Sequence, residues 1–367
     1  MPGPSTVADV SERDLVARIR QHLVPAPDWL LVGIGDDAAV VEPPRNRVEV
    51  LSVDAIVEDI HFSRAFVPPD AIGHRALAVN LSDLAAMGAA PRLALLSMAL
   101  PEALPLADFD AIAAGFAALA VRHTVHLAGG NLTRSPGPLM IDVTVVGTVK
   151  RRQALTRGGA RPGDDLYVSG TIGAAAAGLA LLRERAAVIS HQSSVSSQQP
   201  SVAGGLTTDD RRLKTDDLRL TADDLRLVTA YLRPSPRVRM GVLMSRNRAA
   251  RACMDLSDGL ADAAHQLADA SGVGVTIDAA ALPIDPAARA RFEARGMDAV
   301  AEALTGGDDY ELLLAVRPGA HRRFAAAARH GDVPLTRVGH CTDGRAVTLR
   351  RGSNGTQPLP QGYSHFR

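Results

Sequence analysis

Two glycine turns that each carry a pair of aspartates are the first candidates for chemistry in this chain. One is GIGDDAAV, with Asp36 and Asp37, and the other is TGGDDYEL, with Asp308. Adjacent carboxylates repel a phosphate unless a cation lies between them, and carboxylate oxygens are ligands that Mg²⁺ prefers. AVVEP follows the first turn and is typical of a strand, so the helix that a dinucleotide fingerprint requires is missing. We interpret this turn as metal-binding, with an ordinary turn as the alternative.

Polar side chains also recur at regular spacing within two apolar elements. Ser52 and Asp54 lie two residues apart and share one face of an expected strand. Asn80 and Asp83, spaced i and i+3, share one face of a helix that is apolar nearly all round. A buried carboxylate without a partner is costly, so either a metal ion or a structural hydrogen bond must compensate it. Asp54 also forms a polar cluster with Glu58, Asp59 and His61 after the strand, for which a solvated loop start is the alternative reading.

Further candidates come later in the chain. CMDLSDGL places Asp255, Ser257 and Asp258 at a strand-to-helix junction, where an N-cap is the alternative reading. AGGNLTRSPG (128–137) is expected to be a glycine-rich loop that lets backbone approach a phosphate, and Arg157 is a cation for the same ligand. The chain has no Walker loop, protein-kinase signature or Cys/His zinc set. Oxygen ligands and glycine turns favour phosphoryl transfer with Mg²⁺.

Composition narrows the classes of partner. The chain has 367 residues, of which 46% are hydrophobic and 22% charged, with 40 basic and 40 acidic side chains. A net charge near zero removes the electrostatic reason to expect nucleic acid or an anionic membrane as the partner. No secretory signal or membrane-spanning run is evident. Cys253 and Cys341 have no metal-ligand spacing and predict two thiols in a reducing cytoplasm.

Alternating strand and helix patterns predict an α/β fold (α+β type) with two domains. The basic, Gly- and Pro-containing stretch 150–164 marks the expected boundary, which gives domains 1–150 and 151–367. Expected strands are 48–56, 93–100, 140–149, 165–170 and 311–316, and expected helices are 70–87, 106–123, 173–185, 259–271 and 319–329.

Residues 190–228 differ from the rest of the chain. The stretch 190–207 is rich in Ser and Gln and is predicted to be disordered. Three heptads follow, with leucines at 213, 220 and 227 that would share a helical face. We predict either a tolerated insertion that extends the following helix or, alternatively, a contact surface.

Taken in order, the motifs resemble thiamine-monophosphate kinases, members of the aminoimidazole ribonucleotide synthetase-like superfamily. The resemblance covers nearly the whole chain except 190–228 and includes GIGDDAAV, SVDAIVEDIHF, ALAVNLSDLAAMGA, ALTRGGARPGD, RPSPRVRMG, MDLSDGL, TGGDDYEL and GYSHF. It implies a homodimer of two-domain α/β subunits. The implied reaction is direct, Mg²⁺-dependent transfer from ATP to thiamine phosphate. The N-terminal domain would bind ATP and magnesium and form the dimer.

The resemblance also implies roles for individual residues. The implied metal ligands are Asp37, Ser52, Asp54, Asp83, Asn131, Asp255 and Asp258. The implied ATP contacts are Gly130, Asn131, Arg157 and Ser257, and the implied thiamine phosphate contacts are His61, Asp308 and Tyr363.

The chain departs from the family pattern in two places. Asn131 stands where the family has Asp, and Val53 stands where the family usually has Thr. Two other functions remain as alternatives: a sister ATP-dependent synthetase of the superfamily, and a nucleotide-binding module without catalysis. Selenophosphate synthetase would need a reactive Cys near the N-terminus, and the hydrogenase-maturation member would end in Cys rather than HFR.

Overall fold

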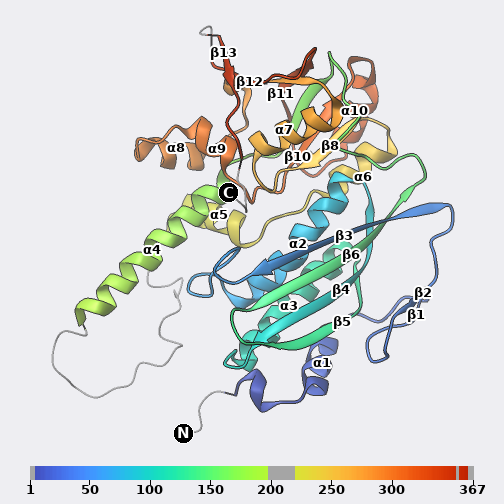
Figure 1. The fold of residues 1–367 in the computed structure, drawn as a ribbon, viewed down its shortest axis with the longest axis vertical. Helices are drawn as coiled ribbons and strands as arrows, with labels where there is room; N and C mark the ends of the chain where they lie inside the picture. Colours follow the sequence, from blue (N-terminus) through green and yellow to red (C-terminus); the bar gives the residue numbers. More distant parts are fainter. Residues whose placement is uncertain (1–4, 197–219, 353–354, 363–367) are drawn as a thin grey trace.

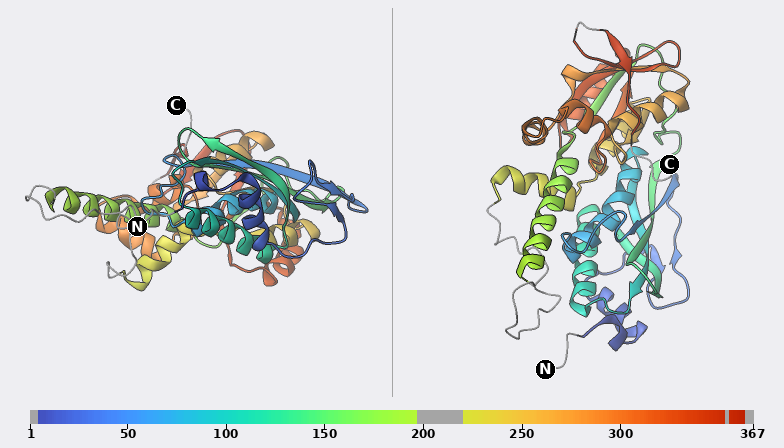
Figure 2. Two further views of the ribbon diagram at one scale, coloured as in Figure 1. Left: turned by 90° about the horizontal axis from the view of Figure 1, so that it is seen from below. Right: turned by 60° about the vertical axis from the view of Figure 1, so that its left-hand side comes forward.

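The computed structural model describes residues 5–196, 220–352 and 355–362. Two large sheets lie one above the other along the long axis of the molecule, each built by one half of the chain, and β1 and β2 form a small third sheet (Figures 1 and 2). The elements of the first half are α1 (Glu12–Gln21), β1 (Leu30–Val32), β2 (Val40–Val41), β3 (Arg47–Val57), α2 (Pro69–Ala86), β4 (Ala90–Pro101), α3 (Leu106–His123), β5 (His126–Ser135) and β6 (Met140–Lys150).

The first sheet has four strands in the order β3-β6-β4-β5, and only the β4–β5 pair is parallel. Helices α2 and α3 cover one face of it (Figure 1). Ile141, Val143 and Val145 alternate along β6 and are fully buried on that face. The strand period of two therefore separates a buried side of the sheet from a side that the two helices do not cover.

Glycines allow α2 and α3 to cross at close range. A Cβ atom on Gly73 of α2 would lie 1.9 Å from the carbonyl oxygen of Ile112, and one on Gly115 of α3 would lie 1.9 Å from that of Asp70. Real Cβ atoms do not approach backbone so closely, so any larger residue would push the helices apart. This contact fixes α2, which carries several candidate site residues, against the sheet.

The second sheet has seven strands in the order β13-β12-β9-β11-β7-β10-β8. Its strand β10, LLLAV, lies between β7 and the edge strand β8 and is buried at every position. The elements of the second half are β7 (Asp165–Ser169), α4 (Ala174–Ser196), α5 (Ala222–Leu232), α6 (Val238–Arg246), β8 (Ala252–Asp255), α7 (Leu260–Ser271), β9 (Gly274–Asp278), α8 (Pro286–Ala294), α9 (Ala299–Thr305), β10 (Leu312–Val316), α10 (His321–Arg329), β11 (Leu335–Thr342), β12 (Val347–Arg350) and β13 (Thr356–Pro358).

The predicted strands and helices are confirmed, and α3 has the predicted bounds. One prediction was wrong: residues 128–135 are not a loop but belong to strand β5. The glycines serve strand packing there, because a Cβ on Gly130 would lie 1.8 Å from the carbonyl oxygen of Leu96 on β4. The glycine content of this segment therefore led to the wrong prediction of a loop, although its backbone pairs with a neighbouring strand.

The polar segment 190–207 is also partly corrected, since α4 continues to Ser196. Residues 197–219, which include the first heptad and most of the second, lie outside the described part of the chain. Helix α5 does not extend back into the second heptad, because it begins at Ala222 and Thr221 caps it. The Thr221 hydroxyl accepts the Asp224 backbone N–H at 3.1 Å, which satisfies a free amide of the first turn. The third heptad is therefore the start of α5, and Leu220 lies before that helix.

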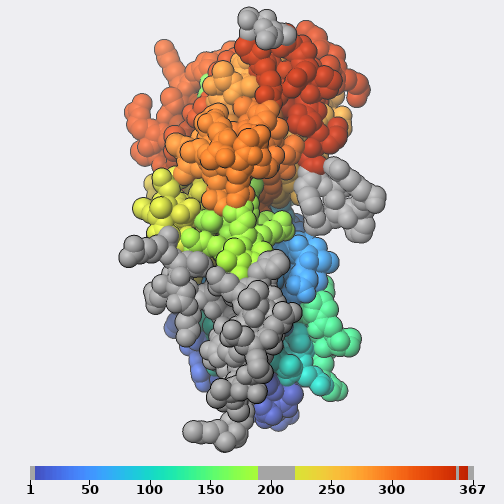
Figure 3. Space-filling view, turned by 90° about the vertical axis from the view of Figure 1, so that its left-hand side faces the viewer, coloured from blue at the N-terminus to red at the C-terminus, as the bar shows by residue number. Residues whose placement is uncertain are grey.

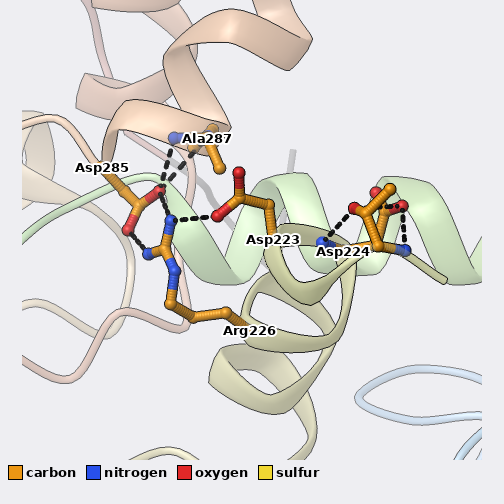
Figure 4. Close-up of polar contacts among 7 residues, drawn as sticks. Asp223, Asp224, Arg226, Asp285 and Ala287 are labelled. Carbon is orange, nitrogen blue, oxygen red and sulfur yellow. Dashed lines mark hydrogen bonds and ion pairs between the residues drawn. The ribbon is translucent and has the colours of Figure 1, made fainter.

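An arginine of the third heptad connects α5 to the start of α8. Arg226 forms an ion pair with Asp285, which is buried and caps α8 by accepting the Ala287 backbone N–H at 2.9 Å (Figure 4). Asp223 approaches the same guanidinium at 3.4 Å. From the side of α4, the elements α8 and α9 (orange) lie above the green α4 and the N-terminal elements lie below it (Figure 3).

Candidate active site

Three aspartates from three separate elements interact where α2 contacts both sheets. Asp54 lies on β3, Asp83 near the end of α2, and Asp255 at the end of β8. We call these three residues the carboxylate group. The Ser52 hydroxyl donates to Asp83, and the Ser82 hydroxyl donates to Asp255 at 2.7 Å. Ser82 and Asp83 are adjacent on α2. That helix therefore carries one carboxylate, Asp83, from the first half of the chain and binds another, Asp255, from the second half through Ser82.

Negative charge accumulates in the carboxylate group. Desolvation and the charges of Asp83 and Asp255 raise the pKa of Asp54 to about 7, although its side chain remains accessible to solvent. Burial, with a smaller contribution from the charge of Asp83, raises the pKa of Asp255 to about 7. Arg157 opposes the rise at Asp255, and its Nη1 donates to Gln266 at 2.5 Å. Such shifts show carboxylates that lack enough positive charge nearby.

Asn80 has a different role from Asp83, although both lie on the same face of α2. Its Oδ1 accepts the backbone N–H of Asp54 at 2.9 Å, and its Nδ2 donates to the backbone oxygen of Asp54 at 3.3 Å. The side chain is fully buried. Asn80 therefore has a structural role, because its side chain binds the β3 backbone by two hydrogen bonds. Asp83 is then the polar residue of this helix face that contacts Ser52.

Other sequence candidates lie apart from the carboxylate group. Asp37 is exposed in the turn between β1 and β2, where its backbone N–H donates to Asp36 at 2.9 Å. Asn131 pairs with Ser97 of β4, which pairs with Asp142 of β6 and so belongs to the sheet face opposite Ser52 and Asp54. Gly130 precedes it on the same exposed edge strand. Tyr363 lies outside the described residues.

The junction after β8 contacts the second aspartate turn directly. The Asp308 backbone N–H donates to the Ser257 carbonyl oxygen at 2.7 Å. A Cβ on Gly307 would lie 2.5 Å from that same oxygen, so the two loops pack without space for a side chain. The N-cap of α7 is Gly259, without a side-chain capping bond, so neither Ser257 nor Asp258 fills the capping role.

Each acidic side chain of the turn at residues 305–311 accepts a hydrogen bond from within the protein. Asp308 accepts Arg75 Nη2 at 2.7 Å, and Asp309 accepts the Gly173 backbone N–H at 3.0 Å, just before α4. Glu311 receives two hydrogen bonds from Arg237, the first at 2.7 Å. Sequence reasoning missed Arg75, although a charged residue within an apolar helix was a signal that could have found it.

His61 lies in the loop after β3. Its Nδ1 accepts the Val57 backbone N–H at 3.1 Å, and its carbonyl oxygen accepts the Tyr231 hydroxyl at 3.2 Å. Tyr231, on α5, lies beneath the Arg75 guanidinium, 4.4 Å from the ring centroid. The structure thus connects two of the residues assigned to thiamine phosphate, His61 and Asp308, through Arg75 and Tyr231.

Within the described ranges, no three His, Cys, Asp or Glu side chains lie close enough to form a complete metal site on their own. Carboxylates that need additional cations, with hydroxyl oxygens beside them, nevertheless fit Mg²⁺, which usually binds one or two carboxylates and takes its other oxygens from water and phosphates. Two cavities, of about 420 and 460 Å³, lie instead beside α1, and no residue of the carboxylate group lines either of them.

Comparison with known proteins defines first the class and then the family. The model of the AIR synthase related protein N-terminal domain matches residues 35–149, and that of the C-terminal domain matches residues 161–352. The chain is 33% identical over 341 residues to the thiamine-monophosphate kinase of Bacillus subtilis, covering 92% of this chain and 94% of that protein. It therefore belongs to the thiamine-monophosphate kinase family.

Solved structures agree with this membership. The thiamine-monophosphate kinase of Stenotrophomonas maltophilia has a TM-score of 0.74 and 37% identity, covering 93% of this chain and 96% of that one. A structure described as AaThiL complexed with AMPPCP and TMP has a TM-score of 0.70 and 28% identity over the full length of both chains. The two-domain fold expected from the sequence is confirmed.

Proposed function

We propose that this chain transfers the γ-phosphoryl group of ATP to thiamine phosphate and so forms thiamine diphosphate and ADP. The observation that carries the proposal is the carboxylate group, in which three aspartates from both halves of the chain gather with too little positive charge nearby. The relative solved with AMPPCP and TMP supports the choice of substrates, because its chain has the same architecture over its full length.

The residues of this chain fit Mg²⁺ as the cofactor. Asp54, Asp83 and Asp255 would hold it, with Ser52 beside Asp83, and the resemblance adds Asp37 and Asp258. When bound, Mg²⁺ would supply the positive charge that brings two polyanionic substrates together. The phosphates and water would provide the remaining oxygen ligands, which agrees with the lack of a complete metal site among the described side chains.

The chain's own groups would orient the substrates. Arg157 and the Ser257 segment lie beside Asp255 and would contact ATP. Asp308 and His61, connected through α2 and α5, would contact thiamine phosphate. The acceptor is a phosphate that is largely ionised at neutral pH, so direct in-line transfer needs no strong general base. We assign no covalent intermediate to the protein.

A second copy of the chain is proposed to cover the outer face of the four-stranded sheet. That face exposes apolar side chains at Leu51, Val53 and Leu95, with exposed fractions of 66%, 57% and 39%. Apolar residues grouped in this way are typical of a protein interface. Asn131 lies on the same face and would belong to the interface, which is how we reconcile its position with the site that the resemblance implies.

We place the enzyme in the cytoplasm and assign it no nucleic-acid or membrane partner. Both cysteines are buried and reduced, and burial raises the pKa of the Cys341 thiol to about 12. Within the described residues, no helix combines the length and apolarity needed to cross a bilayer. The balanced charge of the chain supports the same assignment.

The deciding experiment incubates purified protein with ATP, thiamine phosphate and Mg²⁺ and separates the thiamine esters by chromatography. We expect thiamine diphosphate to form and its formation to stop with excess chelator. Binding of ATP without any thiamine diphosphate would favour the non-catalytic nucleotide-binding module. ATP consumption that depends on a different acceptor would favour a sister synthetase.

A further inference from the structure

Arg75 is a charged residue in the middle of a buried helix. Only 2% of its surface is exposed, and apart from the buried His74 the neighbouring side chains of α2 are apolar and buried. An unpaired arginine at such a position would be strongly unfavourable, so its contacts must compensate the desolvation of the guanidinium. Those contacts reach two elements that are far away in the sequence.

The guanidinium connects α2 to the 305–311 turn and to α5. Nη2 donates to Asp308 Oδ1 at 2.7 Å, and Nη1 donates to the backbone oxygen of Tyr231. The group also lies over the Tyr231 ring, 4.4 Å from its centroid. A planar guanidinium can make two directed hydrogen bonds while stacking on an aromatic ring, which the ammonium of lysine cannot do.

Asp308 is held in a conformation that needs such support. Its φ angle is +66°, in the left-handed region that residues with side chains seldom adopt. Its Oδ1 accepts both Arg75 and the Tyr310 hydroxyl, the latter at 3.1 Å. Among the described contacts, Oδ2 of Asp308 accepts no hydrogen bond, and 28% of this side chain is exposed. One carboxylate oxygen is thus fixed while the other is left for a ligand.

The same arginine reaches the His61 loop through one more residue. Tyr231, stacked beneath Arg75, donates its hydroxyl proton to the His61 carbonyl oxygen at 3.2 Å. Displacing Arg75 would therefore disturb both the aspartate and the loop that we assign to the acceptor. The side-chain contacts of Arg75 do not reach Arg157 or Ser257, which we assign to ATP. Ser257 meets Asp308 through the backbone alone, where its carbonyl oxygen accepts the Asp308 N–H at 2.7 Å.

We propose that Arg75 is a positioning residue for thiamine phosphate, acting through Asp308 and through Tyr231 on the His61 loop. The inference rests on the proposed function, because it uses that substrate. Arg75 touches neither substrate, so its removal should change the affinity for the acceptor and leave that for ATP unchanged. A residue that merely stabilises the fold would not separate the two substrates.

The experiment compares Arg75→Met, which removes the charge, with Arg75→Lys, which keeps it. Arg226→Met is the matched control, since Arg226 also pairs with a buried aspartate and lies on the same helix as Tyr231. Steady-state kinetics give KM for each substrate, and titration calorimetry with thiamine phosphate alone gives Kd independently of turnover. Thermal melts in parallel monitor the fold.

For Arg75→Met we expect KM and Kd for thiamine phosphate to rise by as much as roughly 100-fold, the effect of a misplaced positioning group, with an unchanged KM for ATP. Arg75→Lys should lie between Arg75→Met and the wild type, and Arg226→Met should match the wild type. In an Asp308→Asn background, Arg75→Met should raise KM less than it does in the wild type, because the two residues share one contact.

Four outcomes would overturn the inference. Wild-type affinity for thiamine phosphate in Arg75→Met would reduce Arg75 to a structural residue while leaving the proposed function intact, and equal losses for both substrates would indicate general disorder. If Arg75→Met does not fold, Arg75→Lys decides alone, and its wild-type affinity would count against the inference. A wild type that neither binds nor phosphorylates thiamine phosphate would overturn the proposed function itself, and this inference with it.

Discussion

The carboxylate group and the 305–311 turn both contact α2, yet their acidic side chains have different partners. In the turn, Asp308 and Glu311 each receive an arginine, and Asp309 accepts a backbone N–H. In the carboxylate group, hydroxyls are the main hydrogen-bond partners of Asp83 and Asp255, and the charge of Asp83 contributes to the raised pKa of both Asp54 and Asp255. The acidic side chains of the 305–311 turn have partners within the protein, whereas the crowded aspartates of the carboxylate group need a bound cation. Burial also raises the pKa of Asp309 and of Glu311 in the turn, so the two regions differ in the partners of their carboxylates and not in the direction of these shifts.

The largest effect is expected on turnover when the carboxylate group is broken. Asp54→Ala and Asp83→Ala should each reduce kcat/KM by about 100-fold or more, because each removes charge that would hold the cation against the transferring phosphoryl group. Circular dichroism should show an unchanged fold. Near-wild-type turnover in both variants would remove the carboxylate group from the mechanism.

In the 305–311 turn, a substitution should mainly lower the free energy of unfolding. Arg237→Met leaves Glu311 buried and unpaired, and breaking such a pair by removing one partner costs about 3–5 kcal/mol. Urea denaturation of wild type and variant measures this loss. Double substitution of Arg237 and Glu311 by apolar residues should recover part of the stability, since it also removes the buried carboxylate. A single variant as stable as the wild type would mean that this pair contributes little.

Neutralising Asp54 should instead increase the stability of the metal-free protein. Its pKa is raised from 3.8 in the unfolded chain to about 7, so the folded state binds this proton more tightly. The resulting destabilisation is absent below about pH 4, grows as the pH rises toward 7, and is complete above it. Because the side chain is accessible, we expect Asp54→Asn in EDTA to raise Tm by no more than about 2–4 °C at pH 8.

The same difference in Tm should disappear near pH 4, where the wild-type carboxyl is protonated in both states. Adding Mg²⁺ at pH 8 should reverse the order, because only the wild type keeps the charge that binds the cation. A lower Tm for Asp54→Asn at pH 8 in EDTA would show that Asp54 stabilises the fold, as the ion pairs of the 305–311 turn do.

The smallest effect is expected at Asn131. A family-like aspartate there would bind Mg²⁺ more tightly if the residue were a ligand, by about the 10–100-fold that loss of a supporting partner costs a metal site. The register of β5 places it across the sheet from Ser52 and Asp54, so Asn131→Asp should leave the Mg²⁺ requirement almost unchanged. A Mg²⁺ titration that shows a clearly lower requirement in the variant would place Asn131 at the metal in the working dimer.

Local patterns in the sequence determined the elements and the chemistry they carry. Alternation along β3 placed Ser52 and Asp54 on one face, and i, i+3 spacing placed Asn80 and Asp83 on another. Apolar periodicity gave the bounds of α3 because a long amphipathic or buried helix has a strong signal. The ordered motifs identified the family, which the comparisons confirm.

Tertiary structure decided which of these residues meet. Pairing of β5 with β4 turned a Gly-rich segment into a strand and put Asn131 on the far face, since register depends on a neighbour and not on local sequence. Packing of α2 against β8 brought Ser82 to Asp255, which lies 173 residues away. The partnership of Arg75 with Asp308 spans 233 residues, and no local pattern could select it, because a buried charge finds its partner only when the whole fold closes around it.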